Sequence, residues 1–189
     1  KDDYAVAVAN TSDQTAKVTI TRGANTVTTV DVAPMSVQIV TLPWVNELTK
    51  GSGPSVMVVD GAYRLRSTRP VTVYQYNPLK ATTTNDASLL LPVNTWTGNY
   101  LVAAWPHWVN AYPGFYAVVA QKDNTKVTLK PSATGKSVAA GGGVAADGTG
   151  VVTLNEGDVL QVMSSANDVT GTIVSADKPV QVFGGHECT

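Results

Sequence analysis

One sequence pattern occurs twice in the chain. Residues 62–76 read AYRLRSTRPVTVYQY, and residues 171–185 read GTIVSADKPVQVFGG. Each stretch predicts a strand, a turn that ends in a basic residue and a proline, and a second strand in which apolar and polar residues alternate. Pro179 lies 109 positions after Pro70, and the same offset places Val127 on Val18. Distant segments that repeat in one register indicate a duplicated unit.

The composition favours β-structure and excludes two classes of partner. The chain is 43% hydrophobic and 14% charged, with 16 Gly and 10 Pro, which is typical of a turn-rich β protein. The net charge is −1 and the 13 Lys and Arg are scattered, so we expect no nucleic acid partner. No apolar run approaches the roughly 20 residues of a membrane helix, so we expect no membrane insertion. Because the chain does not start like a signal peptide, we expect a mature or excised piece.

The first half of the chain predicts a β-sandwich over residues 1–80. Its short strands alternate with period two, so that Val18 and Ile20 share one face of a strand. Residues 45–48 predict one helical turn. The predicted strands are residues 4–9, 16–22, 26–32, 37–42 and an edge strand at 55–59, followed by the two strands of the repeated stretch.

The second half repeats this order over residues 99–189. Residues 115–120 are matched to residues 4–9 at an offset of 111, which falls to 109 at Val127. Residues 81–98 are predicted to be a packed connection, because a mobile linker would not contain a buried run such as Leu89-Leu90-Leu91. The fold class is therefore all-β, with two tandem, internally duplicated β-sandwich units packed against each other.

A glycine-rich segment at residues 139–150 absorbs the remaining difference in length between the halves. Such a segment can cradle a phosphate only between a strand and the start of a helix. Here a predicted strand follows it. We therefore expect a flexible hairpin loop.

Several short motifs agree in order and spacing with a known family. They are Asp86–Pro92, Trp96, Asn99-Tyr100, Lys178-Pro179-Val180 and Gly184–Cys188. With them the chain resembles, over nearly its whole length, the N-terminal domain of the IgG-Fc-binding-protein family, which includes large mucus proteins and bacterial secreted or surface proteins. The resemblance implies an extracellular, non-enzymatic module of β-strands that serves binding or adhesion.

Catalytic and metal chemistry have few candidate residues. The chain has two histidines, His107 and His186, and the second lies beside Glu187 and Cys188. Adjacent residues of a strand point to opposite faces, so we expect His186 to bond the backbone at a strand end. Hard oxygen ligands for calcium occur at Asp2-Asp3, Asn85-Asp86 and Asn167-Asp168, but such residues usually bond their own turns. We expect no enzyme activity and no cofactor, with calcium left as the alternative.

The aromatic segment Trp105–Phe115 is the candidate contact surface. It contains Trp105, His107, Trp108 and Tyr112, and rigid aromatic side chains dominate contact energies. The competing interpretation places Trp105 and Trp108 in the core together with Trp44 and Trp96. The single cysteine, Cys188, is expected to form a disulfide with a residue outside this fragment.

The predicted function is an extracellular or cell-surface binding or adhesion module whose partner is a protein or a glycan. One alternative is a structural subunit of a stalk, filament or matrix that self-associates. A further alternative is a carbohydrate-binding module that uses exposed aromatic residues.

Overall fold

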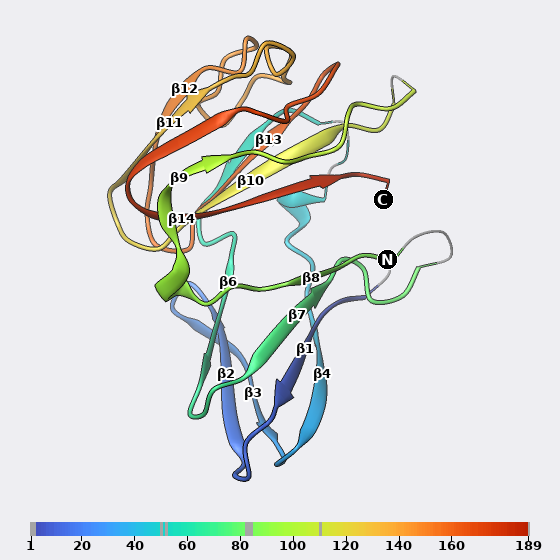
Figure 1. Cartoon of the computed structure of the whole chain (residues 1–189), viewed down its shortest axis with the longest axis vertical. Coiled ribbons are helices and arrows are strands. Elements are labelled where there is room, and N and C mark those ends of the chain that lie inside the picture. Colours follow the sequence, from blue (N-terminus) through green and yellow to red (C-terminus); the bar gives the residue numbers. More distant parts are fainter. Residues whose placement is uncertain (1–2, 50, 52, 82–84, 110, 189) are drawn as a thin grey trace. The chain divides into compact units, whose positions relative to one another are not determined.

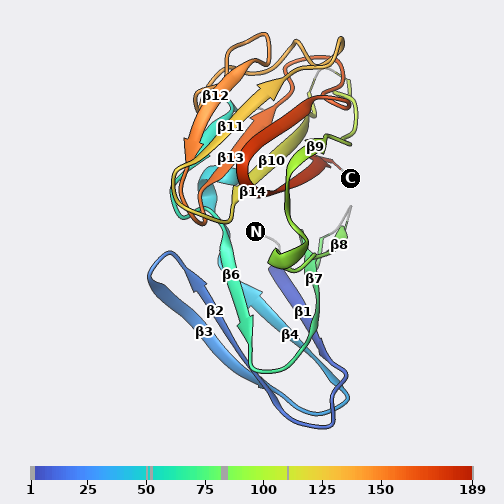
Figure 2. The same ribbon diagram turned by 60° about the vertical axis from the view of Figure 1, so that its left-hand side comes forward.

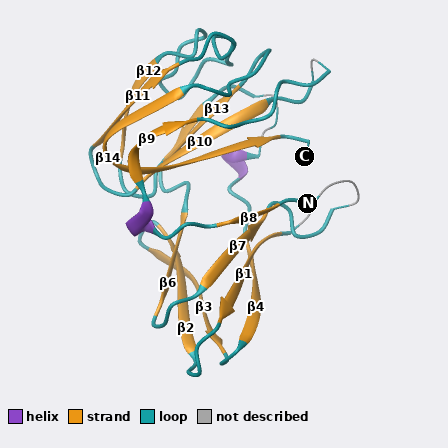
Figure 3. Cartoon of the chain, in the orientation of Figure 1, coloured by secondary structure: helices purple, strands orange, loops and turns teal. Residues whose placement is uncertain are grey.

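The computed structural model describes residues 3–49, 51, 53–81, 85–109 and 111–188. Strands dominate these residues, and the helical turns η1 (Asn46–Leu48) and η2 (Val93–Thr95) are each three residues long (Figure 3). The predicted all-β class is confirmed, as is the helical turn near residues 45–48. Within the described residues, none of the helices has the length and apolar character needed to cross a membrane.

The chain forms two compact units. Unit 1 comprises Lys1–Trp44 and Tyr63–Pro92, and unit 2 comprises Val45–Ala62 and Val93–Cys188. The predicted edge strand at residues 55–59 is therefore part of unit 2, not of the first sandwich. Its observed form, β5 (Val56–Val58), pairs with β13 (Val159–Met163).

Unit 1 is a two-layer β-sandwich (Figures 1 and 2). One sheet has the order β4 (Ser36–Leu42), β1 (Tyr4–Asn10), β7 (Thr72–Tyr76), β8 (Ala87–Leu89), and the other has the order β3 (Asn25–Val32), β2 (Ala16–Arg22), β6 (Tyr63–Ser67). Val6 and Val8 of the first sheet share one core with Val18 and Ile20 of the second. Each such side chain stabilises the fold by about 1.5–3 kcal/mol when fully buried.

In unit 2, one long strand, β14 (Ile173–His186), lies in the middle of a single hydrogen-bonded sheet. The strand order is β12 (Gly150–Leu154), β11 (Thr125–Lys130), β14, β10 (Gly114–Ala120), β13, β5, and β9 (Thr97–Leu101) also pairs with β14. The first residues of β14 pair with β11, and its residues from Val180 onward pair with β10. The predicted strand, turn and strand are thus one strand with an irregularity between Ser175 and Val180.

The strand pairing confirms the duplication. Val18 lies opposite Ser67, and Val127 lies opposite Ala176, so both members of the pair recur 109 positions later. The antiparallel pairs of the two units correspond. In unit 1, β1 pairs with β4 and β7; in unit 2, β10 pairs with β13 and the second part of β14. Likewise β2 pairs with β3 and β6, and β11 pairs with β12 and the first part of β14.

The predicted offset of 111 for the first strand is wrong by one residue. Val8 lies opposite Val73, and Val118 lies opposite Val182. Val182 lies 109 positions after Val73, so Val118, 110 positions after Val8, is its equivalent. Burial explains the correction, because Val8 and Val118 both face a core, whereas an offset of 111 would place Val8 on the half-buried Val119.

The connection between the two halves, residues 81–98, packs against unit 1 through part of its length. Leu89 and Leu91 are exposed, and of the leucine run only Leu90 packs against the core of unit 1, because the run lies along the edge of the sheet rather than inside it. β9 begins at Thr97, inside the predicted connection, and ends at Leu101.

Candidate aromatic contact site

The segment between β9 and β10, residues 102–113, carries the candidate contact residues and is called the aromatic loop below. Trp105 is 61% exposed, Trp108 is 53% exposed and Tyr112 is 39% exposed. The interpretation of Trp105 and Trp108 as core residues is therefore wrong. Trp44, the proposed core partner, instead packs against Tyr4 in unit 1, with 5.5 Å between the ring centroids.

The base of the aromatic loop is fixed to residues 164–172, which we call the supporting loop. The Val102 N–H donates to the Thr172 carbonyl oxygen at 2.9 Å, and the Gly171 N–H donates to the Val102 carbonyl oxygen at 2.8 Å. The Thr170 hydroxyl accepts from the Ala104 N–H and donates to the Ala104 carbonyl oxygen, both at 3.0 Å. These bonds hold the backbone that precedes the exposed aromatic residues.

The tip of the aromatic loop is a tight hairpin. Trp108 and Tyr112 exchange two backbone hydrogen bonds of 2.9 and 3.1 Å, and their ring centroids lie 5.9 Å apart. Val109, inside this hairpin, has φ of 45°, a left-handed conformation that is strained for a β-branched residue. The hairpin therefore presents two large rings as one pre-arranged surface.

His107 anchors the loop rather than joining the exposed rings. Its N–H donates to the Asn167 carbonyl oxygen at 2.7 Å, and its Nδ1 lies 3.3 Å from the hydroxyl oxygen of the buried Ser164. The Ser164 N–H in turn donates to the Gly114 carbonyl oxygen at 2.9 Å. Of the four predicted contact residues, the structure gathers three exposed rings on one loop and places His107 against the supporting loop.

Two glycines allow the aromatic loop to lie close to the strands. A Cβ on Gly114 would overlap the Trp105 carbonyl oxygen, and a Cβ on Gly184 would overlap the Ala103 carbonyl oxygen. Sequence reasoning missed this supporting role of Gly114 and Gly184, and also that of Ser164 and Thr170. The available signal was the Gly184-Gly185 pair, because glycine inside a strand often marks a close backbone approach.

The other candidate chemical groups have structural roles. His186 is 8% exposed at the end of β14, and its Nδ1 accepts the Cys188 N–H at 3.0 Å, as predicted for a histidine at a strand end. Asp86 and Asp168 each accept a backbone N–H within their own turns, and Asp2 lies outside the described residues. Across the part of the chain that the structure describes, no three His, Cys, Asp or Glu side chains are grouped to hold a metal ion.

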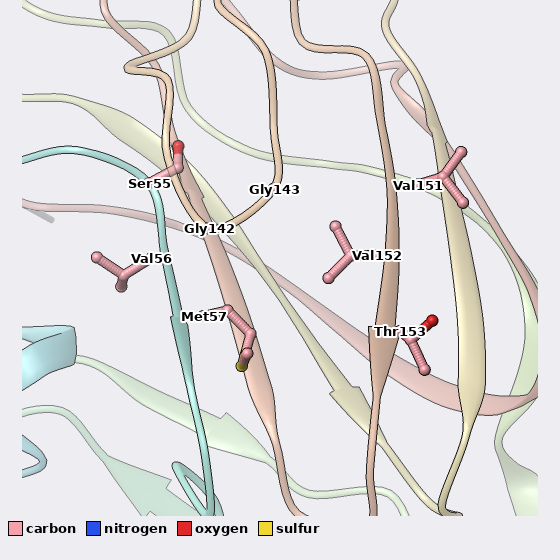
Figure 4. Close-up of a pocket in the computed structure, with 8 residues that line it drawn as sticks. All are labelled: Ser55, Val56, Met57, Gly142, Gly143, Val151, Val152 and Thr153. Atoms are coloured by element: carbon pink, nitrogen blue, oxygen red, sulfur yellow. The ribbon is translucent and has the colours of Figure 1, made fainter.

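A shallow groove of about 550 Å³ lies between β5, β12 and the glycine-rich segment (Figure 4). Its lining offers two hydroxyl groups and no titratable side chain: Ser55, Val56, Met57, Gly142, Gly143, Val151, Val152 and Thr153. Ser55 is buried and its hydroxyl oxygen accepts the Met163 N–H at 3.0 Å. A Cβ on Gly142 would lie 2.7 Å from the Val56 carbonyl carbon, so this glycine serves close packing on β5.

Comparison with known proteins supports the family resemblance. The model of the family described as IgGFc binding protein matches residues 86–189. The match covers more than half of the chain, including β9, the aromatic loop and β10–β14, rather than nearly the whole length. No curated protein and no solved structure matches the chain. The chain therefore belongs to the IgGFc binding protein family.

Proposed function

We propose that this chain is an extracellular or cell-surface binding or adhesion module that is not an enzyme, and that it contacts a protein ligand through the aromatic loop. The observation that carries the proposal is the exposure of Trp105, Trp108 and Tyr112 on one anchored loop. Membership of a binding-protein family supports the same class of function. The proposed function requires no cofactor.

The physics of the loop favours a protein contact made by apolar burial. Large aromatic side chains bury much area with few rotatable bonds, and a loop that is already ordered loses little entropy on binding. Residues 101–115 contain no Asp, Glu, Lys or Arg. Binding through this loop should therefore change little between low and physiological salt, unlike binding that depends on surface charges.

The experiment measures binding of the full chain to immobilised immunoglobulin Fc, the first ligand that the family suggests, by surface plasmon resonance. Trp108→Ala should weaken binding by about 2 kcal/mol or more, roughly thirtyfold, because a central aromatic contact is lost. Its melting temperature should change little, because Trp108 is 53% exposed. Tyr74→Ala, at an exposed tyrosine of unit 1, is the matched control and should leave binding unchanged.

A glycan array with the same variants distinguishes the alternatives. Binding to glycans alone, lost in Trp108→Ala, would favour the carbohydrate-binding module. A wild-type chain that binds neither Fc nor glycans, or an Fc affinity that Trp108→Ala leaves intact, would contradict the proposal.

A further inference from the structure

The edge strand β4 of unit 1 lacks a neighbour that its equivalent in unit 2 has. Val40 lies opposite Val6, and Val162 lies opposite Tyr116, so β13 corresponds to β4 at an offset of 122. In unit 2, β13 lies between β10 and β5, whereas in unit 1, β4 pairs with β1 alone among the described strands (Figure 1).

The pairing of β5 shows what kind of segment fits this edge. Residues 159–161 of β13 lie opposite β5 in antiparallel register, with Val159 facing Val58 and Gln161 facing Val56. The corresponding residues of β4 are Val37, Gln38 and Ile39. The segment that covers the edge in unit 2 is short, extended and uncharged.

Burial differs sharply between the two equivalent strands. All five residues of β13 are buried. In β4, Val37 is 63% exposed and Ile39 is 51% exposed. Two of the three β4 residues that correspond to the β5-paired part of β13, Val37 and Ile39, are therefore exposed apolar side chains.

The β4 edge also lacks the features that prevent an exposed edge strand from pairing with a strand of another molecule. Its sequence, SVQIVTL, contains no charged residue and no proline. Its register with β1 runs without a bulge from Tyr4–Leu42 to Asn10–Ser36. Proteins usually protect an exposed edge with charges, prolines or bulges, and a regular apolar edge pairs readily with another strand.

We propose that β4 is the site at which a second copy of this chain adds, by antiparallel pairing of β4 with β4 across a two-fold axis. A register centred on Gln38 places Val37 of one copy opposite Ile39 of the other, so apolar faces apolar and no like charges meet. In such a dimer, each β4 gains a second neighbouring strand, as β13 has in β5. A two-fold axis gives this neighbour to both copies at once. The surface is distinct from the aromatic loop, and the inference does not depend on that loop.

The test is sedimentation velocity of the full chain over a range of concentrations, with Ile39→Lys and Val37→Lys compared with the wild type. The wild type should show a concentration-dependent dimer. Each lysine variant should raise the dimer dissociation constant by about tenfold or more, because a two-fold axis introduces every change twice. Val151→Lys is the matched control, since Val151 is 59% exposed on the edge strand β12, and it should leave the dimer intact.

Hydrogen exchange provides a second readout that does not depend on the folding of a variant. In the wild type, the amides of residues 36–42 should exchange more slowly as concentration rises. A monomer at all concentrations, or a dimer that is insensitive to both lysine variants, would overturn the proposal. So would a monomeric chain that instead binds a synthetic peptide of residues 54–60, because the edge would then take a different strand.

Discussion

At the scale of single residues, the half-buried Tyr4 and the buried Tyr116 couple the stability of the protein to pH. Burial is the main cause that raises the pKa of Tyr4 to about 12, and the nearby Tyr63 adds to it. Burial also raises the pKa of Tyr116, which lies in the core of unit 2. Both side chains are therefore neutral in the folded protein at a pH where an unfolded tyrosine, with a pKa of 10.0, begins to ionise.

The free energy of unfolding should be insensitive to these groups below about pH 10 and should fall above it. A tyrosine whose pKa is higher in the folded than in the unfolded protein contributes to the free energy of unfolding. This contribution is complete below the pKa of the unfolded state and is lost as the pH rises through the folded-state pKa, here from 10 to about 12 for Tyr4. The full loss for Tyr4 is about 2.7 kcal/mol, of which about 1.4 kcal/mol is reached by pH 11. Urea unfolding between pH 8 and 11 measures that first part, and the double variant Tyr4→Phe/Tyr116→Phe should flatten the fall. An identical alkaline slope in that variant would count against this assignment.

At the scale of elements, the repeated turn uses different residues to satisfy the same backbone groups. The Thr68 hydroxyl oxygen accepts the Lys17 N–H at 2.9 Å, and the Asp177 Oδ1 accepts the Lys126 N–H at 2.8 Å, 109 positions later. The following basic residue reaches the first turn of its own unit. Lys178 Nζ donates to the Asp123 and Asn124 carbonyl oxygens at 2.6 and 2.8 Å, and the Arg69 guanidinium donates to Gln14 Oε1.

Removing the acceptor in this turn should destabilise unit 2 modestly. Asp177→Ala leaves the Lys126 N–H without its side-chain acceptor, and we expect a loss of about 0.5–1 kcal/mol in the free energy of unfolding. Asp177→Asn keeps an oxygen at the same position and should be close to the wild type. Guanidinium unfolding of both variants gives the comparison. Equal losses in the two would mean that the carboxylate charge, and not the hydrogen bond, is what matters.

The sequence predicts those elements whose patterns are local. The alternation in β2 and β11 fixes which side chains face a core, and the turn with its proline marks the repeat in both halves. It does not predict the partner of β5, because three apolar residues fit any sheet edge, and pairing with β13 across about a hundred positions decides it. It also does not distinguish the exposed Trp105 and Trp108 from core residues, because hydrogen bonds from the supporting loop decide where the aromatic loop lies.

At the scale of the whole chain, the two units have the same strand order but differ in their family match and in their exposed aromatic residues. The family match covers β9, the aromatic loop and β10–β14, whereas residues 1–85 repeat much of the fold outside the match. The exposed aromatic side chains of the candidate site lie within the matched part. The contact surface that we propose therefore belongs to unit 2.

Hydrogen–deuterium exchange of the full chain with and without immunoglobulin Fc tests this assignment most directly. We predict that the ligand slows exchange in residues 102–113 and 164–172, because these two segments are hydrogen-bonded to each other and support the exposed rings. Trp108→Ala should abolish that protection at equal ligand concentration. Protection confined to unit 1, or protection of unit 2 that spares residues 102–113, would contradict the assignment of the aromatic loop as the contact surface.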